Sequence, residues 1–356
     1  MENRIARLAR GLDPALYRVE VMSLRPAGTG QVELAPGIRH HFFPISSGLH
    51  PIRLARLALF IRRGSYDVVH THNWSSMFYG ILAGTLARFP GKRPLVLHGE
   101  HGLNRSDLQG IPWKRLWAQR ILSRLVQGIV PVNGIIAAHV ASKWRIPHQR
   151  LKIINNGVDL ERFRPAPPPA GQGLVLGMVG RLDDVKDLAC ALRALAILKD
   201  KRDAGDVLLI LVGDGPLTAI LVAEAARLDI TGSVEFAGGR KDVENWYSRF
   251  HVYMNTSVYE GMSNTLLEGM ACGLPLIVSR VPGNSAWLKD KENALFFEPG
   301  DAEGLATRIL ELRADPVVRS EMGKRNRVKV EREFDNRKFL GVYADFYQGL
   351  VSNKVG

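Results

Sequence analysis

Short, continuous apolar runs alternate with longer amphipathic stretches along most of the 356 residues. Runs such as Val207–Val212 hold no polar residue, which is typical of parallel strands that are buried on both faces. The stretches between the runs carry apolar residues at helical spacing. This alternation predicts an α/β protein with doubly wound sheets. In the second half, strands are expected at residues 174–179, 207–212, 234–237, 252–254, 276–278 and 294–297.

The first half shows the same alternation less regularly, with a helix expected at residues 78–88. Between the halves, four prolines between Arg164 and Gly171 cannot continue a helix or a central strand, so they indicate a stiff linker. We place the hinge at residues 157–172. Ligands of such sheets bind at the carboxyl ends of the strands, so we expect the two domains to face each other across a cleft. Further strands are expected at residues 18–22, 68–70, 95–97 and 128–131.

The positive charge is confined to one half of the chain. Residues 1–165 hold 24 Lys and Arg against 9 Asp and Glu, a net charge of +15, whereas the remainder holds 24 against 26 and carries −2. Nine of the ten histidines also lie in the first half. This division predicts two domains with different partners, and nucleic acid and an anionic membrane surface are both candidates for the basic one.

Neither a secretory signal nor an apolar run of the roughly 20 residues that span a bilayer is visible, so we expect a cytoplasmic protein. Cys190 and Cys272 have no spacing typical of a metal site and are expected to be small core residues.

The segment Tyr259–Pro275 holds the strongest candidate site. A loop of Gly, Ser and Asn follows an apolar run, and a helix is predicted to begin near Asn264, so backbone N–H groups and the helix dipole can stabilise an anion. Glu260 in the loop can accept hydrogen bonds from sugar hydroxyls, and Glu268 can hold a ribose. Alternatively, Glu268 only caps the helix in a capping box with Thr265.

A second candidate follows the first strand of the second half, where a helix is predicted to open at Arg181 and run to residue 198. Arg181 and Lys186 can neutralise a diphosphate leaving group without a metal. Surface ion pairs at an exposed helix start are the ordinary alternative. The next strand ends in Gly213–Pro216, which a tight turn explains and which does not meet the dinucleotide-binding fingerprint.

Histidines follow two expected strands of the first half, as His70-Thr-His72 and as His98-Gly-Glu-His101. At the carboxyl ends of strands, they would belong to a cleft, where His98 can hydrogen-bond a sugar or orient an acceptor hydroxyl. A His/Glu metal site and plain polar loops are the alternatives, and no ligands at helical spacing support the metal.

Two basic, partly amphipathic helices are expected at residues 50–63 and 112–124. Arginines interrupt the apolar surface of the first, and Trp113 and Trp117 flank basic residues in the second. The combination suits docking on an anionic bilayer, although an ordinary solvated helix face explains each helix equally well.

Taken in order, the motifs of this chain resemble those of the family 4 retaining glycosyltransferases, which have the GT-B fold of two Rossmann-like domains. The resemblance covers nearly the whole chain. The histidine motifs are similar to those of members from bacterial exopolysaccharide and surface-glycan systems, including sugar transferases associated with PEP-CTERM. The motifs are Asn156-Gly-Val-Asp159, Gly180-Arg-Leu-x3-Lys186-Asp, Val212-Gly-Asp-Gly-Pro216, and the Glu260 and Glu268 pair followed by Gly-Met-Ala-Cys-Gly-Leu-Pro.

The resemblance implies an N-terminal, acceptor-binding domain at residues 1–160, a nucleotide-sugar-binding domain at 161–333, and a helix at 334–356 that crosses back to the first domain. His101 and His72 would be acceptor or sugar contacts. The catalytic residues would be His98, Glu260, Arg181 and Lys186. The donor-binding residues would be Arg181, Lys186, Glu260, Gly261, Met262, Ser263, Asn264, Thr265 and Glu268.

Two features depart from the family pattern. Members begin with a strand and a Gly-rich loop, whereas the first twelve residues resemble the helix that follows them. The first strand and loop of the N-terminal domain are therefore expected to be missing and the protein to be weakly active or inactive. Ala286 stands where relatives often carry a glutamate, so a loop or donor contact is expected to differ.

The sequence thus predicts retaining transfer of a sugar from a UDP- or GDP-linked donor to a glycan or lipid-linked glycan, with no metal or other cofactor. No carboxylate is evident as a covalent nucleophile, so same-face attack by the acceptor hydroxyl is the mechanistic hypothesis. A peripheral position on the inner face of the membrane is expected. The alternatives are an epimerase-like GT-B enzyme and, less favoured because no RNA- or DNA-binding motif is present, a nucleic-acid-binding protein.

Overall fold

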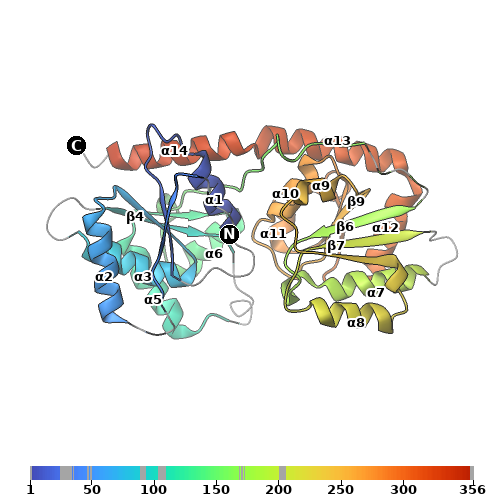
Figure 1. Ribbon diagram of the computed structural model, residues 1–356, viewed down its shortest axis with the longest axis horizontal. Coiled ribbons are helices and arrows are strands. Elements are labelled where there is room, and N and C mark those ends of the chain that lie inside the picture. The colour runs from blue at the N-terminus through green and yellow to red at the C-terminus, as the bar shows by residue number, and fades with distance from the viewer. Residues whose placement is uncertain are drawn as a thin grey trace. The chain divides into compact units, whose positions relative to one another are not determined.

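The protein folds into two compact units (Figure 1). Unit 1 comprises residues 1–156 and 337–356, and unit 2 comprises residues 157–336. Over the described residues, no helix has the length and hydropathy needed to cross a membrane. The computed structural model describes residues 2–24, 34, 36–45, 48, 50–88, 94–102, 110–167, 169, 171, 173–199 and 206–352.

Unit 2 is built on a six-stranded parallel sheet with the order β11-β10-β9-β6-β7-β8. All six strands predicted for the second half are confirmed to within one residue at either end, because most of them are continuous apolar runs that the sheet buries. The strands are β6 (Leu174–Val179), β7 (Val207–Val212), β8 (Val234–Gly238), β9 (Val252–Asn255), β10 (Leu276–Ser279) and β11 (Ala294–Phe297).

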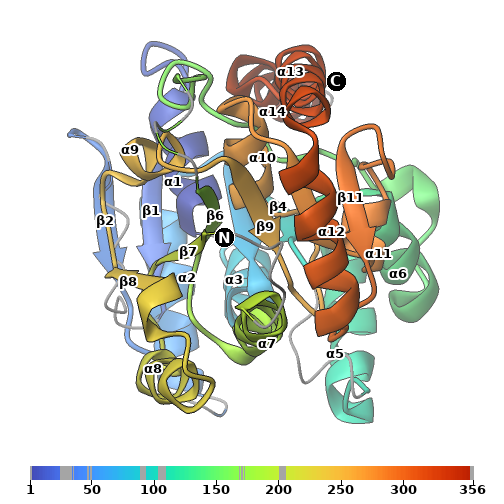
Figure 2. The ribbon, with the colours of Figure 1, turned by 90° about the vertical axis from the view of Figure 1, so that its right-hand side faces the viewer.

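Helices cover both faces of this sheet. Helices α7 and α12 lie side by side on one face, and α10 lies on the other (Figures 1 and 2). A single apolar cluster joins the sheet to α7 and α12 and contains Cys190, which is fully buried as expected. The helices are α7 (Leu188–Lys199), α8 (Thr218–Arg227), α9 (Val243–Tyr247), α10 (Asn264–Ala271), α11 (Pro282–Ser285), α12 (Ala302–Ala314) and α13 (Pro316–Glu333).

The prediction of one helix opening at Arg181 is wrong. A 3-10 turn at Asp184–Lys186 comes first, and Asp187 then adopts a left-handed conformation with φ of 41°. The Asp183 side chain accepts a hydrogen bond from the N–H of Val185 and stabilises the turn. The left-handed residue breaks the helical path, so the helix α7 begins only afterwards.

Unit 1 contains two separate parallel sheets, with orders β1-β2 and β3-β4-β5. Four of these strands were predicted. The strand β2 was not, because its sequence Arg-His-His-Phe has no apolar alternation and three of its residues are exposed. The strands are β1 (Glu20–Ser23), β2 (Arg39–Phe42), β3 (Val68–His72), β4 (Leu95–Glu100) and β5 (Gly128–Pro131).

The apolar core of unit 1 is divided as well. One cluster joins α1 and α14 to β4 and β5, and another joins α2 to α3. The buried Arg4 guanidinium fastens α1 by donating to Tyr343 Oη at 2.7 Å and to Asn156 Oδ1 at 2.6 Å. The helices are α1 (Glu2–Gly11), α2 (Pro51–Arg63), α3 (Asn73–Leu86), α5 (Trp113–Leu125), α6 (Gly134–Trp144) and α14 (Asn336–Ser352).

Candidate functional site

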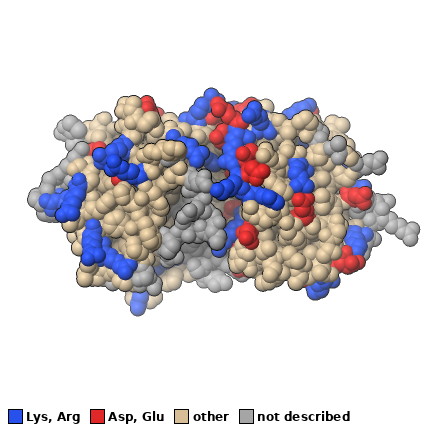
Figure 3. Space-filling view, in the orientation of Figure 1, with Lys and Arg blue, Asp and Glu red and all other residues tan. Residues whose placement is uncertain are grey.

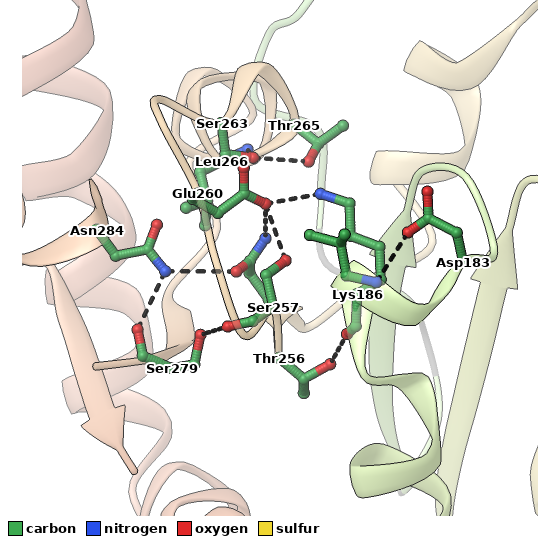
Figure 4. A network of polar contacts seen from close by, with 12 residues as sticks. Asp183, Lys186, Thr256, Ser257, Glu260, Ser263, Thr265, Leu266, Ser279 and Asn284 are labelled. Carbon is green, nitrogen blue, oxygen red and sulfur yellow. Dashed lines mark hydrogen bonds and ion pairs between the residues drawn. The ribbon is translucent and has the colours of Figure 1, made fainter. Parts of the chain in front are cut away.

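A polar network in unit 2 connects the turn after β6 with the loop after β9 (Figure 4). Its centre is one carboxylate oxygen, Oε1 of Glu260. This atom accepts hydrogen bonds from Lys186 Nζ at 2.6 Å, Ser257 Oγ at 2.8 Å and Asn255 Nδ2 at 3.1 Å. Because β6 and β9 are neighbours in the sheet, two motifs 74 residues apart meet at its carboxyl edge.

The Lys186–Glu260 ion pair is largely buried, with side chains 23% and 12% exposed. Burial raises the pKa of Glu260, but the Lys186 ammonium and the hydrogen bonds from Lys186, Asn255 and Ser257 outweigh burial, so the pKa lies below its usual value. Glu260 is therefore ionised at neutral pH. Removing either partner would leave a buried charge without compensation, which is costly.

Backbone contacts hold both partners of this pair. Thr256 Oγ1 donates to the carbonyl of Lys186 at 2.6 Å, which fastens the 3-10 turn to the segment after β9. On the other side, a Cβ added to Gly283 would lie 1.9 Å from the carbonyl oxygen of Glu260. Only glycine permits this approach of α11 to the loop.

Asn284 in α11 supports the network from behind. Its fully buried amide donates to the carbonyl of Ser279 at 3.0 Å and to Asn255 Oδ1 at 3.4 Å, and Asn255 in turn donates to Glu260. The sequence singled out none of these supporting residues. Ala286, expected to alter a loop or donor contact, is exposed at the end of the same helix.

The capping-box alternative for Glu268 is wrong. The residue that caps α10 is Ser263, whose hydroxyl accepts from the N–H of Leu266 at 3.4 Å. Glu268 lies further along the helix, is buried, and accepts a hydrogen bond from Tyr247 Oη at 2.8 Å. Residues 261–263 follow Glu260 in the chain and lead into α10, whose first turn is capped by the hydroxyl of Ser263.

Arg181 lies in the turn after β6 but outside the network. Its side chain is 72% exposed and lies 3.9 Å from Asp183, a contact that contributes little. The glycines of the turn after β7 support this region, because a Cβ on Gly213 would lie 1.8 Å from the carbonyl oxygen of Gly180. Close backbone approach, beyond turn geometry alone, therefore requires Gly213.

The predicted histidines cluster within unit 1. His98 is completely buried, with Nδ1 2.9 Å from Thr71 Oγ1 and Nε2 3.4 Å from Glu100 Oε2. His72 Nδ1 and His101 Nε2 are 2.9 Å apart, and their rings are stacked. Burial, followed by nearby positive groups, holds the pKa of both His72 and His101 well below the usual value. Both are neutral at pH 7, so each has one ring nitrogen that donates a hydrogen bond and one that accepts.

Within the described parts of the chain, no three His, Cys, Asp or Glu side chains are grouped so as to hold a metal ion. The expected independence of metal stays a prediction. The structure thus brings Lys186, Glu260 and the start of α10 together in unit 2, and the histidines together in unit 1.

Two sequence families match the chain, one in each half. Residues 1–162 match the family described as Glycosyltransferase Family 4, and residues 173–315 match the family described as Glycosyl transferases group 1. The two matches together cover most of the chain.

Curated relatives and solved structures are similar over most of their length. The chain is 26% identical over 314 residues to the UDP-Gal:alpha-D-GlcNAc-diphosphoundecaprenol alpha-1,3-galactosyltransferase of Escherichia coli, covering 85% of this chain and 80% of the relative. It is 28% identical to the putative glycosyltransferase EpsF of Bacillus subtilis, covering 75% and 68%. The structure of Anabaena HepE in complex with UDP and glucose superposes with a TM-score of 0.82 at 18% identity, covering 98% and 95%.

Proposed function

Because the chain belongs to the family 4 glycosyltransferases of GT-B fold, we propose that unit 2 binds a nucleotide sugar and that the enzyme transfers its sugar with retention. The Lys186–Glu260 pair at 2.6 Å carries this proposal, since it places a cation for a diphosphate beside an anion for sugar hydroxyls. One relative named for a lipid-linked acceptor and one named for lipopolysaccharide core biosynthesis support a place in bacterial polysaccharide or glycan biosynthesis, with a glycan or lipid-linked glycan as the proposed acceptor.

In the proposed reaction, the bond between the anomeric carbon and the diphosphate oxygen breaks, and its electron pair remains on the diphosphate. Lys186 and Arg181 stabilise that charge, and no metal is required. The acceptor oxygen bonds to the anomeric carbon on the same face, and its proton passes to the departing phosphate oxygen. A UDP- or GDP-linked donor is proposed, and the complex of HepE with UDP supports the first.

In this proposal, Glu260 accepts hydrogen bonds from hydroxyls of the donor sugar, because its carboxylate is ionised. The hydrogen bonds from Asn255 and Ser257 hold that carboxylate in position. The N–H groups from Gly261 to Thr265 lie at the positive end of α10, where they add to the anion site. Glu268, which Tyr247 holds by a hydrogen bond, is assigned to the ribose.

On the acceptor side, His72 and His101 are proposed as acceptor or sugar contacts, since neutral imidazoles orient hydroxyls without competing for the diphosphate. His98 remains a predicted catalytic residue. It is completely buried, so contact with a sugar would require its neighbours Thr71 and Glu100 to move.

The test is to incubate the protein with a panel of UDP- and GDP-linked sugars and to measure their slow hydrolysis without acceptor. Lys186→Ala and Arg181→Ala are each expected to lower turnover of the active donor roughly 100-fold or more. Lys199→Ala, which removes an exposed ion pair in unit 2, is the matched control. Unchanged turnover in Lys186→Ala would refute the mechanism, an isomerised donor would indicate the epimerase, and loss of turnover in EDTA would overturn metal independence.

We also propose that unit 1 docks on an anionic membrane. On the face that Figure 3 shows, Lys and Arg dominate over unit 1, whereas both signs are mixed over unit 2. Helix α5 exposes Trp113 by 73%, Trp117 by 62% and Ile121 by 38%, all on one stripe. In α2, Ile52 and Leu59 are exposed on one face together with arginines. Apolar stripes beside basic side chains are typical of interfacial helices.

Co-sedimentation with vesicles tests this docking. Binding is expected to vesicles that contain phosphatidylglycerol and to be about tenfold weaker in the double variant Trp113→Ala/Trp117→Ala. Ile220→Ala, an exposed apolar residue of unit 2, is the control. Equal binding by both variants would contradict the proposal, as would salt-sensitive binding to an oligonucleotide without binding to vesicles.

A further inference from the structure

His72 and His101 form a directly hydrogen-bonded pair of imidazoles at the carboxyl edge of the sheet of β3, β4 and β5. His72 is the last residue of β3, and His101 follows β4, its neighbour in the sheet. His72 Nδ1 lies 2.9 Å from His101 Nε2, and the ring planes are inclined by only 27°. The N–H of one ring can therefore point at the lone pair of the other, since both lie in their ring planes.

Glycine at position 99 makes room for this pair. In the register of the sheet, Gly99 of β4 lies opposite His72 of β3. A Cβ added to Gly99 would lie 2.6 Å from His72 Nδ1, which is the atom that meets His101. Any larger residue at this position would therefore displace the ring of His72, and the hydrogen bond between the two rings depends on the absence of a side chain.

A buried cation near the pair opposes any further proton on it. Burial is the first cause of the low pKa of both histidines, and the charge of Arg4 on α1 adds to it. Arg4 is only 2% exposed, and over the described ranges no carboxylate pairs with it. Its hydrogen bonds go to three neutral acceptors, which are Asn156 Oδ1, Tyr343 Oη and the carbonyl of Ile154. Because this positive charge is uncompensated, the pair stays neutral, with one proton on each ring.

A neutral pair of this kind always presents one donor and one acceptor outward. If His72 Nδ1 carries the proton of the shared hydrogen bond, His72 Nε2 accepts and the N–H of His101 Nδ1 donates; if His101 Nε2 carries it, the two roles are exchanged. The exchange takes up one proton at one outer nitrogen and releases one at the other, so the total is unchanged. Neither outer nitrogen has a partner among the described residues, and neither is a fully buried atom, so solvent reaches both.

We propose that the His72–His101 pair binds two hydroxyl groups of an uncharged sugar and discriminates against anionic groups, so that both residues determine specificity for the acceptor. This inference rests on the proposed transferase function. A hydroxyl group both donates and accepts, so two hydroxyls satisfy the pair in either tautomeric state. A sulfate or carboxylate group only accepts, and it leaves the outward acceptor nitrogen without a partner, which is costly. The part of the acceptor bound here is therefore a neutral polyol.

The first test measures the imidazole ¹⁵N resonances of the 356-residue chain at pH 7.5 without any ligand. The resonances of the pair are assigned with the variants His72→Gln and His101→Gln. The protonated fractions of His72 Nδ1 and His101 Nε2 are expected to add up to one, because a single proton occupies their hydrogen bond. A doubly protonated ring, or two inner nitrogens that are both protonated or both bare, would overturn the proposal.

The second test titrates the same resonances with methyl glucoside, methyl galactoside and methyl mannoside, and separately with sulfate. At least one glycoside is expected to shift the outer nitrogens of both histidines and to bind roughly tenfold or more tightly than sulfate. Gly99→Ala keeps both histidines but separates them, so it should abolish this preference. Gly134→Ala, also in unit 1, is the matched control, because no atom lies within 4 Å of the position of its Cβ.

No shift with any glycoside, sulfate binding as tight as that of the glycosides, or a preference that survives Gly99→Ala would refute the role of the pair. These measurements need no turnover, and hydrolysis of the donor is assigned to unit 2. A chain that hydrolyses its donor but binds sulfate as well as sugar would refute only the specificity of the pair. A chain that shows the preference but hydrolyses no donor would refute only the proposed transferase function.

Discussion

Both units are built on parallel strands and helices, but their polar centres are held differently. In unit 2, backbone groups help the side chains to hold the site: Gly283 of α11 closely approaches the carbonyl of Glu260, and Thr256 donates to the carbonyl of Lys186. In unit 1, the histidines are held mainly by other side chains, among them Tyr347 and Thr71, beside an open pocket. We therefore expect unit 2 to keep one geometry, and the side chains around the histidines of unit 1 to tolerate larger shifts.

Acidic pH is expected to cause the largest difference in stability between the two units. Burial, followed by nearby positive groups, lowers the pKa of His70 to about 3 and those of His72 and His101 well below the usual value. In the unfolded chain they bind protons near pH 6.5. Stability of unit 1 is therefore full above about pH 6.5 and falls as pH decreases, by at most about 1.4 kcal/mol per pH unit for each histidine.

Limited proteolysis at pH 7.5 and 5.5, with fragments assigned by mass spectrometry, measures this effect. Cleavage within unit 1 should increase first, since unit 2 contains a single histidine, His251. His70→Asn should reduce the acid sensitivity, and His148→Gln, at an exposed position, should not. Cleavage within unit 2 at the same pH as within unit 1 would contradict this predicted difference in acid sensitivity.

A methyl group added at a glycine is the next largest perturbation. In Gly283→Ala the new Cβ meets backbone of Glu260, so the loop must shift, at a cost of about 1–3 kcal/mol in stability and on the order of a hundredfold in donor affinity. In Gly99→Ala the three atoms nearest to the Cβ belong to the rings of His72 and His70, at 2.6 to 3.2 Å, and we expect these rings to rotate away. Thermal unfolding and donor titration should show the larger loss for Gly283→Ala.

Gly232→Ala is the control, because no atom lies within 4 Å of the position that its Cβ would take. A loss in Gly99→Ala as large as that in Gly283→Ala would contradict the distinction between a rigid and an adjustable site.

The smallest expected effect compares two tyrosine–carboxylate pairs. Tyr247 donates to Glu268 at 2.8 Å in unit 2, and Tyr66 donates to Glu20 at 2.6 Å in unit 1. Tyr247→Phe should cost about 2 kcal/mol of stability and several-fold in donor affinity, because it strips a buried carboxylate of a donor. Tyr66→Phe should lower stability without changing donor affinity. Equal donor affinity in both variants would remove Glu268 from the proposed site.

Much of the fold could be predicted, for a physical reason that the exceptions make clear. The strands of unit 2 are mostly apolar because helices cover both faces of the sheet, and such runs are visible in the sequence. The strand β2 lies at a sheet edge with exposed polar residues, so nothing local marks it. The break before α7 depends on one left-handed aspartate, Asp187, which helical periodicity does not register.

The site was predictable only in part. Lys186 and Glu260 belong to local motifs, but their contact depends on β6 and β9 being neighbours. Nothing in the sequence marks Asn255 and Asn284 as functional, because their roles depend on the fold. The fold lets Asn284 donate to Asn255, and Asn255 donate to Glu260. The glutamate that follows the hydroxyl of Thr265 at capping-box spacing suggested a cap at Glu268, and the tertiary contact with Tyr247 decided otherwise.

In the ion pair between Lys186 and Glu260, each side chain neutralises the charge of the other. An anion that approaches Lys186 must compete with a carboxylate already 2.6 Å away, and it leaves that carboxylate with one donor fewer. In the proposed function, a nucleotide sugar would bring phosphate oxygens to the lysine and hydroxyl groups to the glutamate together. We therefore expect the pair to favour ligands that satisfy both of its members at once over inorganic phosphate alone.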